Sequence, residues 1–307
     1  MSQTVLVADD STLRLIQETY AAYEVEANGP GMVARFKLPH ATVTVYRSKK
    51  VLFQGAHHAQ EASRFQRGEL APLSSAPSNE LKSSVPDDLP TASVIGSDET
   101  GTGDFFGPIT VAACYVPKEK IELLQELGVK DSKMLTDDAM RDMAPLIAAS
   151  CIHSTLTLDN PKYNELQEKG YSQGKMKAMM HNAALNHVLR KMDGAPYDYI
   201  LIDQFAQEQT YYNHLNRSKD VVRDRVIFAT KAEQIHVSVA AASILARFQF
   251  LKALDALSER AGVTIPKGAS AKVDKVAARL LRTYGESELK QWTKWHFANR
   301  EKAKRLL

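Results

Sequence analysis

The run Tyr199-Ile200-Leu201-Ile202-Asp203 is an uninterrupted apolar segment that ends on an acid. Apolar side chains on both faces are typical of a central strand buried between two layers of helices. A second such run follows at Val226-Ile227-Phe228-Ala229, and from Glu233 to Leu254 apolar residues recur every three or four positions. This spacing predicts one long core helix after the second strand.

The segments before these runs show the same alternation of strands and helices. We expect strands over 93–96, 109–115 and 151–158, and helices over 137–149 and 175–192. Strands that alternate with long helices predict a sheet covered by helices, in a domain of the α/β or α+β class. The domain is expected to span residues 92–307.

Residues 68–91 are rich in Pro and Ser and have no apolar periodicity, which predicts a linker. The preceding residues 1–67 predict a small α+β domain with an antiparallel sheet. Its expected order is a strand, a helix, three strands and a closing helix, over 4–7, 13–23, 33–37, 42–46, 50–53 and 59–65. Five cations cluster around these strands and predict a positive face, namely Arg35, Lys37, Arg47, Lys49 and Lys50.

Composition places the chain among ordinary globular proteins. It has 307 residues, of which 44% are hydrophobic and 24% charged, and these values exclude a mainly disordered chain. We find no apolar run of the roughly 20 residues that span a bilayer, and no secretory signal pattern at Met1. Cys114 and Cys151 match no disulfide framework or metal-ligand spacing. A reducing, cytoplasmic location is therefore expected.

Positive charge is concentrated at the C-terminal end of the chain. Residues 271–307 contain ten Lys and Arg against four Asp and Glu. Such a segment attracts phosphate backbones, although a solvated helix face explains the same pattern. The aromatic residues Trp292, Trp295 and Phe297 lie among these charges. We expect them to pack the tail onto the core.

Acidic residues occur where predicted strands end or a helix begins. Asp98 and Glu99 precede a glycine-rich segment, Asp203 closes its strand, and Glu233 starts the long helix. Each has an ordinary explanation, as a solvated turn, a helix cap or a partner for the helix dipole. Ligand sites of α/β sheets nevertheless gather at strand ends, and carboxylates that meet there need cations between them. Two divalent ions would balance four carboxylates and suit in-line attack on a phosphodiester.

Asp98 and Glu99 pose a geometric difficulty, because neighbouring residues of a straight strand point to opposite faces. We expect the glycines that follow to allow a bend or an abrupt strand end.

Several motifs together resemble the bacterial ribonuclease HIII enzymes, of the type 2 ribonuclease H family. They are Gly96-Ser97-Asp98-Glu99-Thr100-Gly101-Thr102-Gly103-Asp104-Phe105-Phe106-Gly107-Pro108, Lys130-Asp131-Ser132-Lys133, Asp203, Lys231-Ala232-Glu233 and Ser238-Val239-Ala240-Ala241-Ala242-Ser243-Ile244-Leu245-Ala246-Arg247. The resemblance covers the whole chain and implies a ribonuclease H-like catalytic domain. It also implies a substrate-binding N-terminal domain similar to half of the TATA-box-binding-protein fold.

The resemblance assigns the catalytic and metal-binding residues to Asp98, Glu99, Asp203 and Glu233. It implies endonucleolytic hydrolysis of the RNA strand of RNA/DNA hybrids, leaving 5′-phosphate and 3′-hydroxyl ends, with two Mg²⁺ or Mn²⁺ ions. Glu at 233 resembles type HIII, since the sister ribonuclease HII has Asp there. Gly101-Thr102-Gly103 departs from the Gly-Arg-Gly of ribonuclease HII, so efficient cutting at a lone ribonucleotide in DNA is not expected.

Substrate contacts are expected in the glycine-rich segment and at two lysines. Gly101 and Gly103 would let backbone groups between Thr100 and Asp104, including those of Thr102, approach a ribose 2′-hydroxyl, although a tight turn explains the same glycines. Lys133 and Lys231 are candidate phosphate contacts or simple surface charges.

Two other functions remain open at this point. One is another two-metal nuclease of the ribonuclease H superfamily, and the other is a nucleic-acid-binding relative without catalysis. The presence of all four carboxylates argues against the second. We expect the protein to act on its nucleic acid as a monomer, without an obligatory protein partner or a membrane.

Overall fold

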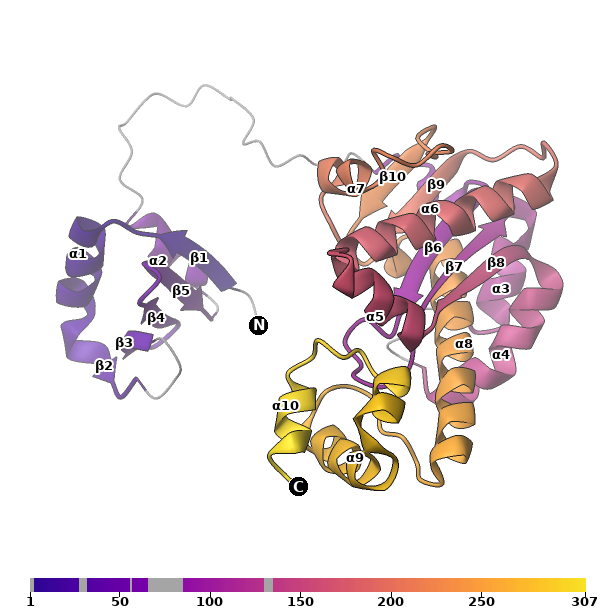
Figure 1. The fold of residues 1–307 in the computed structure, drawn as a ribbon. Coiled ribbons are helices and arrows are strands. Elements are labelled where there is room, and N and C mark those ends of the chain that lie inside the picture. Colours follow the sequence, from indigo (N-terminus) through magenta and orange to yellow (C-terminus); the bar gives the residue numbers. More distant parts are fainter. Residues whose placement is uncertain (1–2, 28–31, 56, 66–84, 130–134) are drawn as a thin grey trace. The chain divides into compact units, whose positions relative to one another are not determined.

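The structure is a computed structural model that describes residues 3–27, 32–55, 57–65, 85–129 and 135–307. The chain divides into two compact units, Met1–Ser78 and Asn79–Leu307, and each is described by itself (Figure 1).

The N-terminal unit contains an antiparallel sheet of five strands in the order β1-β5-β4-β3-β2. These strands are β1 (Gln3–Val7), β2 (Glu24–Val25), β3 (Met32–Lys37), β4 (Thr42–Tyr46) and β5 (Lys50–Gln54). Two α-helices accompany them, α1 (Asp10–Tyr20) and α2 (His58–Ser63), with a 3-10 turn η1 (Ala21–Tyr23). The expected strands and helices are confirmed, and the two-residue β2 is additional.

The two faces of this sheet differ because apolar and polar residues alternate along its strands. Ile16 and Tyr20 of α1 pack with Phe36, Val43 and Phe53 in one buried cluster. On β3 the residues that point the other way include exposed Arg35 and Lys37, and Lys50 is exposed at the start of β5. Three of the five cations that were predicted to form a positive face therefore lie opposite the helices, whereas Lys49 pairs with Asp10 of α1.

The second unit contains a mixed sheet in the order β10-β9-β6-β7-β8. Its strands are β6 (Val94–Thr100), β7 (Ile109–Val116), β8 (Ile152–Leu158), β9 (Tyr199–Asp203) and β10 (Val226–Ala229). Strands β6, β9 and β10 are parallel, and β7 runs antiparallel to both β6 and β8. The carboxyl ends of β6 and β9 therefore lie at one edge of the sheet, where Asp98 and Asp203 are found.

Helices cover both faces of this second sheet (Figure 1). On one side lies α6 (Gln173–Met192), and on the other α4 (Asp137–Ser150) and α8 (Val237–Ala261). The remaining elements are η2 (Leu89–Thr91), η3 (Lys118–Lys120), α3 (Ile121–Glu126), α5 (Asn160–Glu168), α7 (Glu208–His214), η5 (Ala232–Gln234), α9 (Ala271–Trp292) and α10 (Asn299–Lys304). Helix α8 is long and apolar enough to cross a membrane by length and composition, but it is mostly buried as a core helix.

Gly96 sets the spacing between β6 and α8. A Cβ added to Gly96 would lie 2.3 Å from the backbone nitrogen of Val239 and 2.4 Å from the carbonyl carbon of Ser238. Real Cβ atoms do not approach backbone so closely, so only glycine lets the start of α8 lie directly on the strand. The acid that follows two residues later is thereby brought close to α8.

Several expectations differ from the structure in detail. Strand β6 continues to Thr100 in register with β7 and ends directly before Gly101, so of the two alternatives the glycines coincide with the end of the strand and not with a bend at Asp98 and Glu99. Glu233 lies in η5, before α8 begins at Val237. Of the residues assigned by composition to a linker, Leu89 is fully buried in the second unit, because it packs on strands β6 and β9. Short helices α3, α5 and α7 were not predicted.

The C-terminal segment packs as expected. Trp292 is buried in an apolar cluster with Phe105, Phe106 and Phe250, and Trp295 and Phe297 are partly buried against that cluster. The tail thus contacts the residues that follow the glycine-rich turn.

Candidate active site

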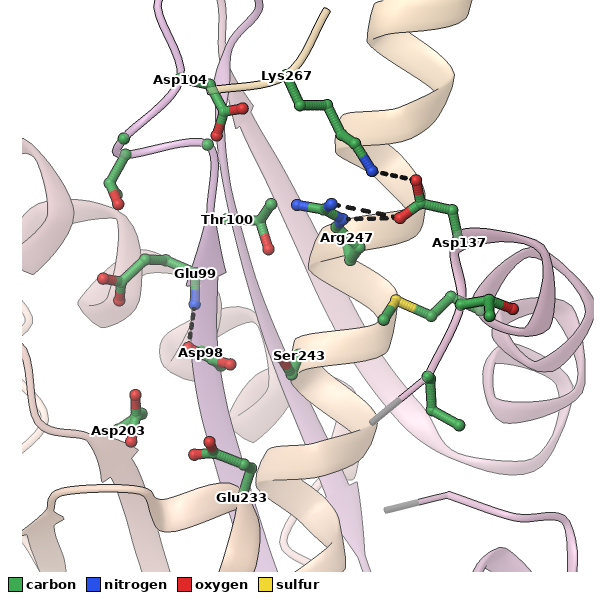
Figure 2. Close-up of a pocket in the computed structure, with 16 residues that line it drawn as sticks. Asp98, Glu99, Thr100, Asp104, Asp137, Asp203, Glu233, Ser243, Arg247 and Lys267 are labelled. Carbon is green, nitrogen blue, oxygen red and sulfur yellow. Dashed lines mark hydrogen bonds and ion pairs between the residues drawn. The ribbon is translucent and has the colours of Figure 1, made fainter. Parts of the chain in front are cut away.

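The four predicted carboxylates line one cavity of about 630 Å³ near the carboxyl ends of β6 and β9 (Figure 2). We call Asp98, Glu99, Asp203 and Glu233 the acidic cluster. Asp98 and Glu99 come from β6, Asp203 is the last residue of β9, and Glu233 comes from η5. The side chains of Asp98, Asp203 and Glu233 point toward one another, while that of Glu99 points away from them (Figure 2).

Asp98 is buried in the middle of this cluster, with 9% of its surface exposed. One carboxylate oxygen accepts the backbone N–H of Glu99 at 2.7 Å, and Ser243 of α8 also donates to the carboxylate. Burial raises the pKa of Asp98 to about 7, and the negative charges of Glu99 and Asp203 add to this effect. The site therefore holds more negative charge than its own hydrogen bonds can stabilise.

Glu99 lies on the other side of β6, against α6. Its carboxylate accepts a hydrogen bond from Lys177 Nζ at 2.7 Å, and its second oxygen lies 2.8 Å from His181 Nε2. Burial alone would raise the pKa of Glu99, but His181 and Lys177 outweigh it and hold that pKa below its ordinary value. The geometric difficulty raised by adjacent acids is thus real, and α6 provides separate partners for the second acid.

The orientation of the His181 ring is fixed by contacts other than the one with Glu99. It is fully buried, its Nδ1 lies 2.7 Å from the hydroxyl of Ser97, and its ring stacks on Phe205 with centroids 5.1 Å apart. Ser97 also donates to the carbonyl of Ala112 in the neighbouring strand β7. A chain of contacts from the sheet core therefore positions Glu99, and Lys177 and His181 belong to the site although they were not predicted.

Asp203 and Glu233 are held by local backbone. The N–H of Ala232 donates to Asp203 Oδ1 at 2.9 Å, which links the end of β9 to the turn that carries Glu233. Glu233 is 6% exposed. The nearby His236 caps α8 by accepting the N–H of Ser238, and burial lowers its pKa to about 4. His236 is therefore a packed, neutral helix cap.

The glycine-rich segment forms the turn that closes the cavity. Residues Thr100 to Asp104 all line it. Gly101 has a φ of +92°, and no atom lies within 4 Å of the point where a Cβ of residue 103 would be. The carbonyl of Thr102 accepts a hydrogen bond from Gln173 of α6 at 3.0 Å. Backbone groups of this turn are therefore accessible from the cavity and held in place from behind.

A fully buried lysine anchors the residues after this turn. Lys294 donates to the carbonyls of Asp104, Gly107 and Pro108 at 2.8, 2.6 and 3.3 Å. Burial lowers the pKa of Lys294 to about 7, against the opposing charge of Asp104. Three acceptors suit the ammonium form, which has three N–H donors.

The two lysines that were predicted to contact phosphate have different outcomes. Lys133 and its motif lie outside the described residues. Lys231 is exposed at a left-handed turn (φ 57°), and it is not among the described residues that line the cavity. Other cations line it instead, namely Arg247 and Lys267, together with Asp137. Arg247 ends a quoted motif, but its charge was not singled out.

The acidic cluster suits hard divalent cations by the chemistry of its donors. Carboxylate oxygens are the preferred ligands of Mg²⁺ and Mn²⁺. In the described part of the chain no three acidic, His or Cys side chains already converge as a metal cage. One reason is that the carboxylate of Glu99 is held against α6, away from the other three carboxylates. The donor set fits the ions, and rotation of side chains would be needed to close around them.

Comparisons with known proteins give a consistent result. Residues 95–300 match the family described as Ribonuclease HII, and residues 3–78 match a domain of unknown function (DUF3378). A protein of Lysinibacillus sphaericus named Ribonuclease HIII is 53% identical over the whole of both chains. A Bacillus subtilis protein of the same name is 47% identical, covering all of this chain and 98% of its own.

Solved structures agree with these sequence matches. Bst-RNase HIII in complex with Mn²⁺ has a TM-score of 0.71 and 42% identity, with 99% of each chain covered. Aquifex aeolicus RNase H3 has a TM-score of 0.54 at 20% identity, covering 95% of this chain and 98% of its own, and it supports the fold alone.

Proposed function

This chain belongs to the ribonuclease HIII family, and from that premise we propose that its acidic cluster is the catalytic centre of a two-metal ribonuclease. The enzyme is a metal-dependent endoribonuclease that hydrolyses the RNA strand of RNA/DNA hybrids. The observation that carries the assignment is the convergence of Asp98, Asp203 and Glu233 on one cavity from three separate elements.

Asp98 and Asp203 are the direct ligands in this proposal. Both lie at strand ends, and the raised pKa of Asp98 reflects a site where negative charge accumulates. Divalent ions bound there would supply a water of lowered pKa and stabilise the leaving 3′ oxygen. Glu99 and Glu233 would complete or orient this arrangement. All four residues belong to one chain, so a single chain can supply the whole acidic cluster. That the enzyme acts as a monomer in the cytoplasm is part of the same proposal.

The glycine-rich turn is proposed to recognise the ribose. Its backbone groups face the cavity beside the acidic cluster, and a 2′-hydroxyl can both donate and accept a hydrogen bond. Anchoring by Gln173 and Lys294 keeps these groups in place before substrate arrives. Lys133 and Lys231 remain proposed phosphate contacts; Lys231 is not among the described residues that line the cavity.

The N-terminal unit is proposed to add affinity for the hybrid. Its sheet presents Arg35, Lys37 and Lys50 on the face opposite the helices. Phosphate contacts by such cations increase affinity without carrying sequence information. Its contribution should therefore appear in binding and in the salt dependence of binding.

A cleavage assay tests the proposed function. The full-length protein is incubated with an RNA/DNA hybrid, double-stranded RNA, double-stranded DNA and DNA with one embedded ribonucleotide, in Mg²⁺, Mn²⁺ or EDTA. We expect cleavage of the hybrid only when a divalent ion is present, weak cleavage at the lone ribonucleotide, and products with 5′-phosphate ends. Equal cleavage of double-stranded DNA would instead favour another nuclease of the superfamily.

A further inference from the structure

A cationic site lies in the same cavity as the acidic cluster. Arg247 comes from α8, and Lys267 from the segment between α8 and α9. Both lie on the side of the cavity away from Asp203 and Glu233 (Figure 2). A substrate that presents one phosphate to the acidic cluster extends beyond it along its backbone. The cations are thus placed where a neighbouring phosphate of the same strand would pass.

Asp137, the first residue of α4, lies between the two cations and contacts both of them. Arg247 Nε and Nη2 both donate to Asp137 Oδ1 at 3.3 Å, and Lys267 Nζ donates to Oδ2. The arginine distances exceed the roughly 2.7–2.9 Å of well-formed charge-assisted hydrogen bonds. Asp137 can balance only one of the two positive charges that it contacts; Asp104 also lines the cavity, where its carboxylate accepts the N–H of Gly268. A phosphate oxygen can accept the same two parallel donors of Arg247.

The backbone around Lys267 is tied to the glycine-rich turn. The N–H of Gly268 donates to the carboxylate of Asp104, and the carbonyl of Gly268 accepts the N–H of Phe105 at 2.9 Å. Arg247 in turn lies over the ring of Phe250, with its guanidinium carbon 5.6 Å from the centroid. The backbone next to Lys267 is therefore fixed by the glycine-rich turn, and Arg247 is held by α8 itself. Both cations are thus positioned more firmly than ordinary surface charges.

We propose that Arg247 and Lys267 bind one backbone phosphate of the substrate strand, and that Asp137 occupies this position in the free enzyme until the phosphate replaces it. This inference rests on the proposed function and identifies a phosphate subsite within the same cavity. Asp137 then acts as an internal competitor that weakens binding. A purely structural role for these residues predicts instead that Arg247 and Lys267 contribute no more to binding than a cation outside the cavity, and that the loss of Asp137 lowers the unfolding temperature.

Binding of a fluorescent RNA/DNA hybrid to full-length protein tests this proposal. All variants carry Asp203→Asn, which slows cleavage enough to leave the hybrid intact during the measurement, and Kd is measured by anisotropy over a series of KCl concentrations. Arg247→Gln and Lys267→Gln should each raise Kd about three- to tenfold and lower the slope of log Kd against log salt by about one. Asp137→Asn should lower Kd about two- to fivefold, the range typical of partly exposed ion pairs.

Two variants serve as controls. Lys252→Gln removes an exposed cation from α8 outside the cavity and should leave Kd and slope unchanged. Lys267→Arg keeps the charge and should restore most of the affinity lost in Lys267→Gln, which separates loss of phosphate binding from misfolding. Thermal unfolding is recorded for every variant.

Three results would overturn the subsite. They are weaker binding by Asp137→Asn, behaviour of Arg247→Gln and Lys267→Gln like that of Lys252→Gln, or no recovery by Lys267→Arg. Failure of the proposed function is distinguishable, because it appears as absent hybrid cleavage by the chain with Asp203 intact.

Discussion

In the N-terminal unit the two helices pack on one face of the sheet and charged residues occupy the other, whereas in the second unit helices cover both faces. Functional groups of the first sheet are therefore exposed cations on a face. Those of the second are partly or fully buried carboxylates at strand ends and in the adjoining turn. An open face can bind a long polyanion but cannot exclude water, while a covered sheet offers chemistry only at its edge. The two sheets should accordingly affect different steps of one reaction.

The largest effect is expected at the edge of the covered sheet. Asp203→Asn removes one negative charge from the acidic cluster and should lower kcat for hybrid cleavage by about a thousandfold, equivalent to several kcal/mol of lost charge stabilisation. KM should change little, because the cation contacts remain. Steady-state kinetics in Mn²⁺ measures both kcat and KM. Undiminished cleavage would show that Asp203 is not part of the catalytic centre.

The partners of Glu99 should matter next. His181→Phe keeps an aromatic ring beside Phe205 but loses the group that contacts Glu99, so kcat should fall by about 10- to 100-fold, as is usual for residues that orient metal ligands. The matched control is His187→Phe on the same helix, whose ring contacts Ser154 instead. Equal activity of the two variants would show that α6 does not position Glu99.

Burial of a charged carboxylate beside a covered sheet lowers the free energy of unfolding, and this effect should depend on pH. The folded pKa of Asp98, about 7, lies above its ordinary value of 3.8, so its contribution to stability is greatest at low pH and is lost as pH rises through 7. Between pH 5 and 8 the metal-free protein should lose about 2 kcal/mol of unfolding free energy relative to Asp98→Asn. Urea unfolding in EDTA at both pH values measures the difference. A constant difference would contradict the raised pKa.

The smallest effect is expected on the open sheet. Replacing Arg35 and Lys37 together by Gln should raise KM for the hybrid about three- to tenfold, reduce its salt dependence and leave kcat unchanged. Arg14→Gln, an exposed change on α1, removes a charge from the helical side of the same unit and is the control. A fall in kcat without a change in KM would show that the N-terminal sheet does not act through substrate binding alone.

The sequence predicted the strands and long helices well because apolar periodicity reports burial directly. The run at 199–202 became β9, and the spacing after 233 became α8. At the end of β6 the glycines left two alternatives, a bend or an abrupt strand end, and pairing with β7 continues to Thr100, directly before Gly101. The four acids could be chosen because their positions at strand ends and the family motifs agreed.

Other parts of the site could not be predicted from the sequence. Lys177, His181 and Lys294 reach the site from helices and a turn far along the chain, and only the packing of those segments brings them to it. Their residue types carry no local signal, since lysines are usually solvated and a single histidine on a helix is usually a core residue. Asp137 likewise has an ordinary place in the first turn of a helix.

Lys294 has a consequence for the chemical labelling of this protein. Its ammonium group is fully buried and donates to three carbonyl groups next to the turn beside the acidic cluster. Reagents that acylate exposed lysines cannot reach it while these contacts persist. Acylation of Lys294 would therefore report local opening of this turn rather than reaction at the protein surface.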